Sequence, residues 1–104
     1  MNLRVKIEVT QEDIDRGARR SCCNCPIALA VKRLVPHCSE VDVRCGAIYA
    51  KTPELWKADA SISVIDFISG FDAGRPVQPF SFPLDLRSVK SYWELNPAAD
   101  PANK

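Results

Sequence analysis

Three cysteines within four positions, from Cys22 to Cys25, are the residues of this sequence best suited to chemistry. Cys22 and Cys25 form a C-x-x-C pair, and Pro26 follows at the expected first position of a helix. Free backbone N–H groups and the helix dipole at such a place are expected to lower the pKa of the Cys25 thiol. Three interpretations stay open at this point: a packed structural corner, a zinc site and a redox centre.

Each interpretation needs different neighbours. A structural corner needs only the small, apolar character of cysteine under a helix start. Zinc would take Cys22 and Cys25 as one ligand pair, with His37, Cys38 or Cys45 supplying the other, although adjacent ligands such as His37 and Cys38 lack the usual spacing. A thioredoxin-type redox motif should follow a strand, whereas an acidic helical turn is expected before Cys22. We therefore predict no cofactor, with zinc as the alternative.

Basic residues surround the cysteine turn and suggest an anion site. They precede the turn or lie in the helix after it: Arg16, Arg19, Arg20, Lys32 and Arg33. Arginine side chains facing a helix N-terminus would suit a phosphate or a nucleotide. The other interpretation is a solvated basic surface.

Catalytic patterns are lacking in the sequence. His37 is the only histidine, and no serine or cysteine motif accompanies it, so a hydrolytic triad is not predicted. Neither of the standard glycine-rich phosphate-binding motifs occurs. We predict that the protein is not an enzyme.

Aromatic residues are the candidates for an interface. Tyr92 and Trp93 follow the last expected strand in a segment with few apolar neighbours, and Trp56 is the other tryptophan. Exposed aromatic side chains often anchor protein interfaces. Folding back of the segment, so that Trp93 seals the core, is the alternative.

The first half of the chain predicts a strand, two helices and a strand. Apolar residues alternate over residues 3–9, as in a half-buried strand. Thr10 and the acids after it predict a short helix over residues 11–17, ended by Gly17. A second helix begins at Pro26, ends at Pro36 and leads to a strand over residues 41–45.

The second half predicts further strands around a third helix. Residues 47–51 and, more weakly, 55–58 form strands, and residues 61–72 form a helix. Residues 80–86 alternate, but Pro83 restricts them to an edge strand, a possible route to self-association. The expected fold is α+β: a small antiparallel or mixed sheet of 4–5 strands with two main helices packed on one face. We expect a single domain over residues 1–94 and a C-terminal tail over residues 95–104.

Bulk properties exclude several classes of protein. The 104 residues carry 46% hydrophobic and 26% charged residues, an ordinary globular composition. The net charge is +1, so nucleic-acid binding is not indicated. No apolar run suits a membrane span or a signal peptide, so we expect a cytoplasmic protein. Five cysteines, an odd number without a leader, argue against a disulfide framework.

Three separated segments resemble a known group of proteins. They are VTQEDIDRG, CxxCPIALA with its cysteines at Cys22 and Cys25, and FDAGRPVQPFSFPLDL. In this order they resemble small, uncharacterised proteins encoded by tailed phages and prophages, over roughly the first 86 residues. The resemblance implies an infected bacterial cytoplasm as the setting, and no catalytic residue.

The resemblance gives the first functional hypothesis. It implies an accessory protein, expected as a homo-oligomer, that binds and inhibits a host protein or sequesters a small anionic, nucleotide-like signal of host defence. The second hypothesis is a small zinc-stabilised module that binds protein or nucleic acid. The third is a thiol redox protein.

Overall fold

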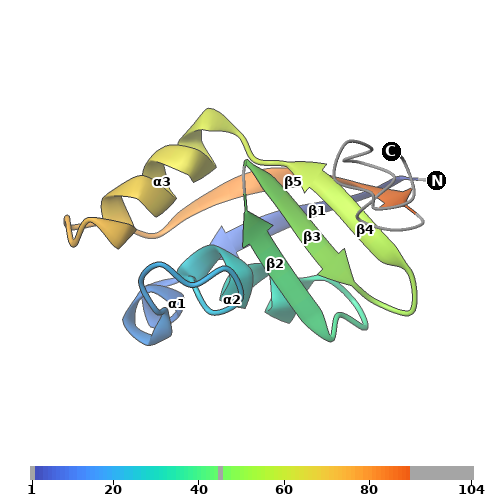
Figure 1. The fold of residues 1–104 in the computed structure, drawn as a ribbon, viewed down its shortest axis with the longest axis horizontal. Helices are drawn as coiled ribbons and strands as arrows, with labels where there is room; N and C mark the ends of the chain where they lie inside the picture. The colour runs from blue at the N-terminus through green and yellow to red at the C-terminus, as the bar shows by residue number, and fades with distance from the viewer. Residues whose placement is uncertain (1, 45, 90–104) are drawn as a thin grey trace, which may run out of the picture.

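A five-stranded antiparallel sheet forms the body of the protein (Figure 1). The structure, a computed structural model, describes residues 2–44 and 46–89. The strands are β1 (Asn2–Val9), β2 (Glu40–Arg44), β3 (Ala47–Lys51), β4 (Leu55–Asp59) and β5 (Phe80–Val89), and the helices are α1 (Gln11–Arg16), α2 (Pro26–Leu34) and α3 (Ile62–Asp72). The predicted α+β class and the predicted order of elements are confirmed.

The sheet order β1-β5-β4-β3-β2 brings the first and last described strands together in the sheet. β5 pairs with β1 from Phe80 to Arg87 but with β4 only from Arg87 to Val89. The expectation that residues 80–86 form an edge strand is therefore wrong for β5 as a whole, because β5 has a neighbour on each side. The reasoning about Pro83 still holds locally, because this residue pairs with Lys6 of β1 in the part of β5 that β4 does not reach.

Both main helices contribute to one hydrophobic core. α2 buries Ile27, Ala28 and Val31, which join the inward-facing side chains of the strands. α3 buries Val64 and Phe67 in the same core. In Figure 1, α3 lies above the far ends of β1 and β5, and α1 and α2 lie below them. α2 contacts β1 and β2, the two outer strands of the sheet.

Aromatic rings fill the space beside α3. Phe67 stacks on Phe80, with ring centroids 4.9 Å apart, and Phe80 stacks on Phe82 at 5.5 Å. Phe80 and Phe82 belong to the part of β5 that does not pair with β4. Such ring contacts add to the burial of apolar area itself.

Local signals fix the corner between β1 and α2. Thr10 and Asp13 form a reciprocal capping box at the start of α1. The Asp13 backbone N–H donates to Thr10 Oγ1 at 3.2 Å, and the Thr10 N–H donates to Asp13 Oδ2 at 2.9 Å. Gly17 ends α1 as predicted, but at φ −67°, which any residue can adopt. The glycine is instead required by space, because Pro26 lies directly against it.

Among the described residues, no helix has the length and apolar character needed to cross a bilayer. Residues 90–94 of the expected domain and the predicted tail, residues 95–104, lie outside the described residues.

Candidate functional site

The cysteine turn is tied to the outer edge of β2. The Val43 backbone N–H donates to the Cys22 carbonyl oxygen at 2.8 Å, so the turn continues the hydrogen bonding of the sheet past its last strand. Within the turn, the Asn24 N–H donates to Ser21 Oγ at 3.0 Å. The thiols of Cys22 and Cys23 are exposed, and their Sγ atoms lie 3.2 Å apart.

Cys25 has a different role from its two neighbours. It is 2% exposed and caps α2, with its Sγ accepting from the Ala28 N–H at 3.5 Å. Burial raises the pKa of the Cys25 thiol and outweighs the hydrogen bonds from Ala28 and Ile27, which lower it. The expectation of a lowered pKa at this helix start is therefore wrong. Cys25 fits the structural-corner interpretation.

The predicted zinc ligands do not form one site in the described part of the chain. Cys25 points into the core, whereas Cys22 is exposed. His37 is exposed at φ 59° in the turn after α2, and Cys38 Sγ donates to the Glu40 carbonyl oxygen at 3.3 Å. Cys45, the other candidate ligand, lies outside the described residues.

A different set of three ligand atoms comes together instead. Within the described chain, the potential metal ligands of Cys22, Cys23 and Asp42 all lie within 4.8 Å of one another. Asp42 lies on β2, next to the residue whose N–H binds Cys22. The Arg44 guanidinium holds the Asp42 carboxylate with both ends, Nε to Oδ1 at 2.9 Å and a second contact to Oδ2.

A cavity opens beside these three residues. Its volume is about 290 Å³, and its walls come from the cysteine turn, from Lys32 of α2 and from residues 39–42. Cys23 and Asp42 both line it. A small ligand can therefore reach this group from the cavity side.

Sequence reasoning missed Asp42 as part of this group. The alternation in residues 41–45 predicts that Asp42 faces away from Val41 and Val43, but it does not say what lies opposite. The partner is the cysteine turn, which is far away in sequence. Only the hydrogen bond between Val43 and Cys22 places the two segments together.

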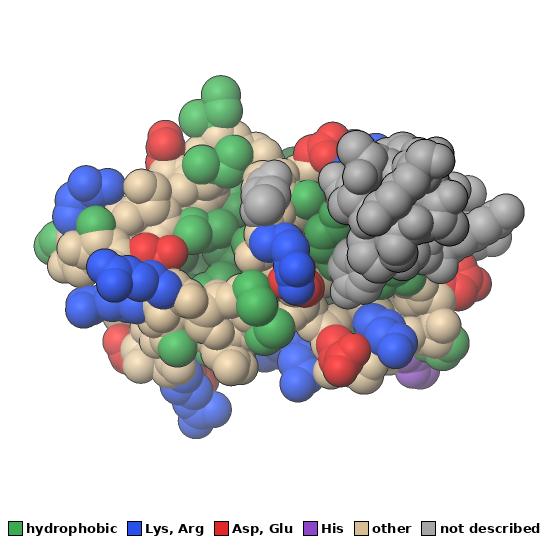
Figure 2. All heavy atoms as spheres, in the orientation of Figure 1, with side chains coloured by type: hydrophobic (Ala, Val, Ile, Leu, Met, Phe, Trp, Pro, Cys, Tyr) green, Lys and Arg blue, Asp and Glu red, His purple; other side chains and the backbone are tan. Residues whose placement is uncertain are grey.

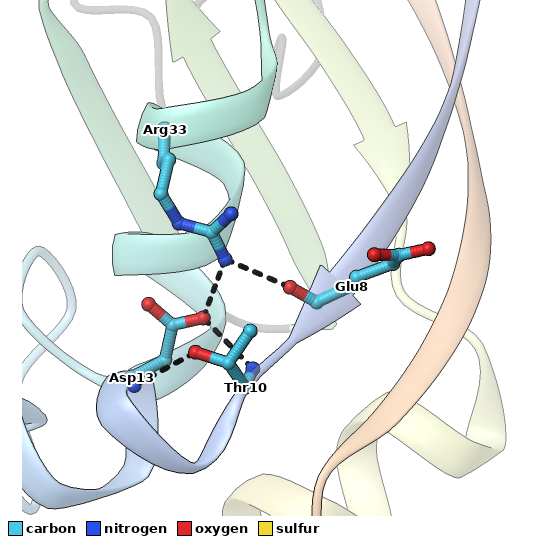
Figure 3. Close-up of polar contacts among 4 residues, drawn as sticks. All are labelled: Glu8, Thr10, Asp13 and Arg33. Atoms are coloured by element: carbon cyan, nitrogen blue, oxygen red, sulfur yellow. Dashed lines mark hydrogen bonds and ion pairs between the residues drawn. The ribbon is translucent and has the colours of Figure 1, made fainter.

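Two of the predicted anion-binding residues, Arg33 (Figure 3) and Arg16, are engaged with carboxylates. One terminal nitrogen of Arg33 contacts Asp13 Oδ2 at 2.8 Å and donates to the Glu8 carbonyl oxygen at 2.9 Å. Arg16 pairs with Glu12 at 2.9 Å on the surface of α1. Arg33 therefore links α2 to β1 and α1, whereas the Arg16 pair lies within α1 alone.

The other three predicted anion ligands lie elsewhere. The Arg20 N–H donates to Asp72 Oδ1 at 2.8 Å, and Arg19 lies beside Gly74, after the end of α3. Lys32 lines the cavity near the cysteine turn. On the face shown in Figure 2, Lys and Arg side chains lie in several separate places. Because the five residues contact different elements, the shared anion pocket gains no support from their placement.

Of the three aromatic interface candidates, Trp56 alone lies among the described residues. Trp56 is 8% exposed and belongs to the core, and its Nε1–H donates to Thr52 Oγ1 at 3.0 Å. Trp56 is therefore not an exposed interface anchor on this chain. Tyr92 and Trp93 lie outside the described residues.

Apolar surface is concentrated on α3. Ile62 is 78% exposed and Ile65 is 45% exposed, and they are the large hydrophobic residues left exposed in the described chain. Ile65 and Ile68 also line a depression of about 130 Å³ with Val43, Arg44 and Gly46. Figure 2 shows hydrophobic side chains gathered in the hollow between α3 and the side of α1 and α2.

The chain has no match in the comparisons with known proteins. Neither a protein-family model, nor a curated protein, nor a solved structure is similar to it. Arguments about function therefore depend on the geometry described above.

Proposed function

We propose that this protein is a non-catalytic binding protein that docks on another protein through the outer face of α3 and the neighbouring end of β2. We call this surface the α3 face and define it by Ile62, Ile65, Ile68 and Val43. The observation that carries the proposal is the exposure of Ile62 and Ile65, 78% and 45%.

These isoleucines are not required by the fold. The core-facing side of α3 is provided by Val64, Phe67 and Gly70, which are buried. Ser61 caps the helix by accepting from the Val64 N–H at 3.4 Å. Polar residues at 62 and 65 would therefore still allow α3 to form. Apolar side chains at these positions instead favour binding, because covering them with a partner removes apolar surface from water.

The shape of the α3 face favours a protein partner. Ile62 and Ile65 are three residues apart and so lie on one side of the helix. Beside them, the depression lined by Ile65, Ile68 and Val43 can receive an apolar side chain. A projecting ridge next to a small hollow is typical of a hot-spot region in a protein interface.

The resemblance to phage-encoded proteins supplies the setting of the proposal. We propose that the protein acts in the cytoplasm of an infected bacterium and inhibits a host protein. The sequestering of a nucleotide-like signal is the weaker branch, because its five proposed ligands engage different parts of the structure. In the homo-oligomer that we expect, the partner on the α3 face is a second copy of this chain.

Substitution of the exposed isoleucines tests the proposal. Ile62→Asp and Ile65→Asp in the full chain should abolish capture of a host protein from bacterial lysate, while the thermal unfolding midpoint changes little. Ser63→Asp, exposed on the same helix, is the matched control and should retain capture. Sedimentation of the purified chain separates self-association from partner binding. Equal capture by all three variants would refute docking through the α3 face.

A further inference from the structure

We propose that Cys22, Cys23 and Asp42 bind one thiophilic divalent cation, of which zinc is the reference ion. The three ligand atoms already lie within 4.8 Å of one another, with both cysteines exposed and Asp42 partly buried. This site does not depend on the α3 face, and either proposal can fail without the other.

Cys22 and Cys23 are adjacent in sequence, which is not the usual spacing of zinc ligands, but the distance between their sulfur atoms suits chelation. Zinc binds thiolate sulfur at about 2.3 Å in tetrahedral geometry, so two sulfurs on one ion lie about 3.8 Å apart. The Sγ atoms of Cys22 and Cys23 are 3.2 Å apart without an ion. A small rotation of two exposed side chains therefore reaches the required separation.

The turn that carries the two thiols is held from three sides. The Val43 N–H binds the Cys22 carbonyl oxygen at 2.8 Å, which fixes the turn to β2. The Ala18 N–H donates to the Asn24 carbonyl oxygen at 2.8 Å, just after the thiols. The Arg20 N–H donates to Asp72 of α3, just before them. Preorganisation of this kind reduces the entropy that is lost when an ion binds.

Arg44 completes the environment of the carboxylate ligand. Its guanidinium contacts both oxygens of Asp42 and so fixes the direction of the carboxylate. Each carboxylate oxygen has a second lone pair, which stays available to an ion. Metal-binding carboxylates are commonly oriented by such an outer hydrogen bond. The positive charge of Arg44 also offsets the excess negative charge of two thiolates and one carboxylate around a divalent ion.

The chemistry of binding is a simple exchange of protons for metal. The two S–H bonds lose their protons to solvent as two sulfur–metal bonds form, and no electron is transferred. Three protein ligands leave one tetrahedral position for water. The cavity lined by Cys23 and Asp42 gives solvent access to that position. Cys25 and Cys38 take no part, because one caps α2 and the other binds the Glu40 carbonyl oxygen.

Cobalt(II) substitution tests the site directly. The reduced full chain, titrated with Co²⁺ under a non-thiol reductant, should show a thiolate-to-cobalt charge-transfer band that saturates at one ion per chain. Zn²⁺ should then remove the band by displacement. Cys22→Ser and Cys23→Ser should each weaken binding more than about 100-fold, and Asp42→Asn about 10- to 100-fold. Because these thiols are exposed, circular dichroism of the variants should match the wild type.

Matched controls decide between this site and others. Cys38→Ser should leave the titration unchanged, because the Cys38 thiol donates to the Glu40 carbonyl oxygen and is not part of the proposed site. A missing band in the wild type would overturn the proposal, as would a band that survives Cys22→Ser together with Cys23→Ser. Loss of binding in Cys45→Ser with full binding in Asp42→Asn would overturn the assignment of Asp42. A disulfide between Cys22 and Cys23 in air, without metal uptake by the reduced chain, would also refute it.

Discussion

Gly17 lies directly against the ring of Pro26. A β-carbon at Gly17 would stand 2.5 Å from Cδ and 2.6 Å from Cγ of Pro26. Pro26 is buried at the first position of α2, so it has no free space into which to move. The closeness of these two residues sets how α1 meets α2.

Gly17→Ala should therefore destabilise the protein. Gly17 has an ordinary φ of −67°, so the cost comes from overlap with Pro26 and not from backbone strain. We expect a loss of about 1–3 kcal/mol in the free energy of unfolding, as for other overpacked sites. Urea denaturation measures this loss. Gly70→Ala, inside α3, is the control: its β-carbon would meet Val77, beyond the end of α3, at an ordinary 3.5 Å, and a gain of about 0.5–1 kcal/mol is expected.

Asp13→Asn should loosen the corner shown in Figure 3. Asp13 accepts from the Thr10 N–H and from Arg33, and its side chain is 9% exposed. Loss of the charge weakens the contact with Arg33 in a largely buried place, so we expect about 1–3 kcal/mol of destabilisation in thermal unfolding. Asp15→Asn, exposed on the same helix and hydrogen-bonded to Gln11, should change stability by less than about 0.5 kcal/mol. Equal effects of the two variants would contradict the special role of Asp13.

The cysteines should differ sharply in their reaction with an alkylating agent. Cys22 and Cys23 are exposed, so iodoacetamide should modify both in the native protein. Cys25 is buried and its pKa is raised, so it should react only after unfolding. Peptide mass spectrometry of the labelled chain locates the modification. Rapid labelling of Cys25 under native conditions would show that α2 does not begin as described.

Alkaline pH should weaken the protein through Cys25. Burial raises the pKa of this thiol in the folded state above its ordinary value of 9.0, so the unfolded chain loses its proton first. The stabilisation is complete below pH 9 and is lost as the pH rises toward the folded pKa. Cys25→Ser keeps a capping oxygen for the Ala28 N–H but does not titrate in this range. The difference in unfolding free energy between wild type and variant should therefore become smaller above pH 9, and a constant difference would refute this account.

Short-range sequence patterns predicted most of the helices and strands. Alternation over residues 3–9, the cap at Thr10 and the proline at Pro26 depend on neighbours in sequence, and the structure has each element where these signals place it. The position of β5 between β1 and β4 was not predictable in this way. Pro83 indicates only that one side of its strand is unpaired locally, and β5 gains its second neighbour, β4, further along at residues 87–89.

The sequence predicted that the cysteine turn would form part of the candidate site, but it did not predict which residues come together there. The C-x-x-C spacing pointed to Cys22 and Cys25, and the structure separates them because Cys25 caps α2 and is buried. Asp42 joins the group through a hydrogen bond between the turn and β2, which no local pattern encodes. The basic residues illustrate the same limit, since Arg33 binds Asp13 and the carbonyl of Glu8.

The pairing of β1 with β5 also has a consequence for synthesis of the chain. β1 is made before the other described strands, yet its neighbour among them in the sheet is β5, the last of them, with Asn2 opposite Arg87. During translation, Ile7 and Val9 thus lack their sheet partners until Phe82 and Phe80 have been made. Pairing over such a separation is slow, and the waiting strand is open to contact with other nascent chains or with chaperones.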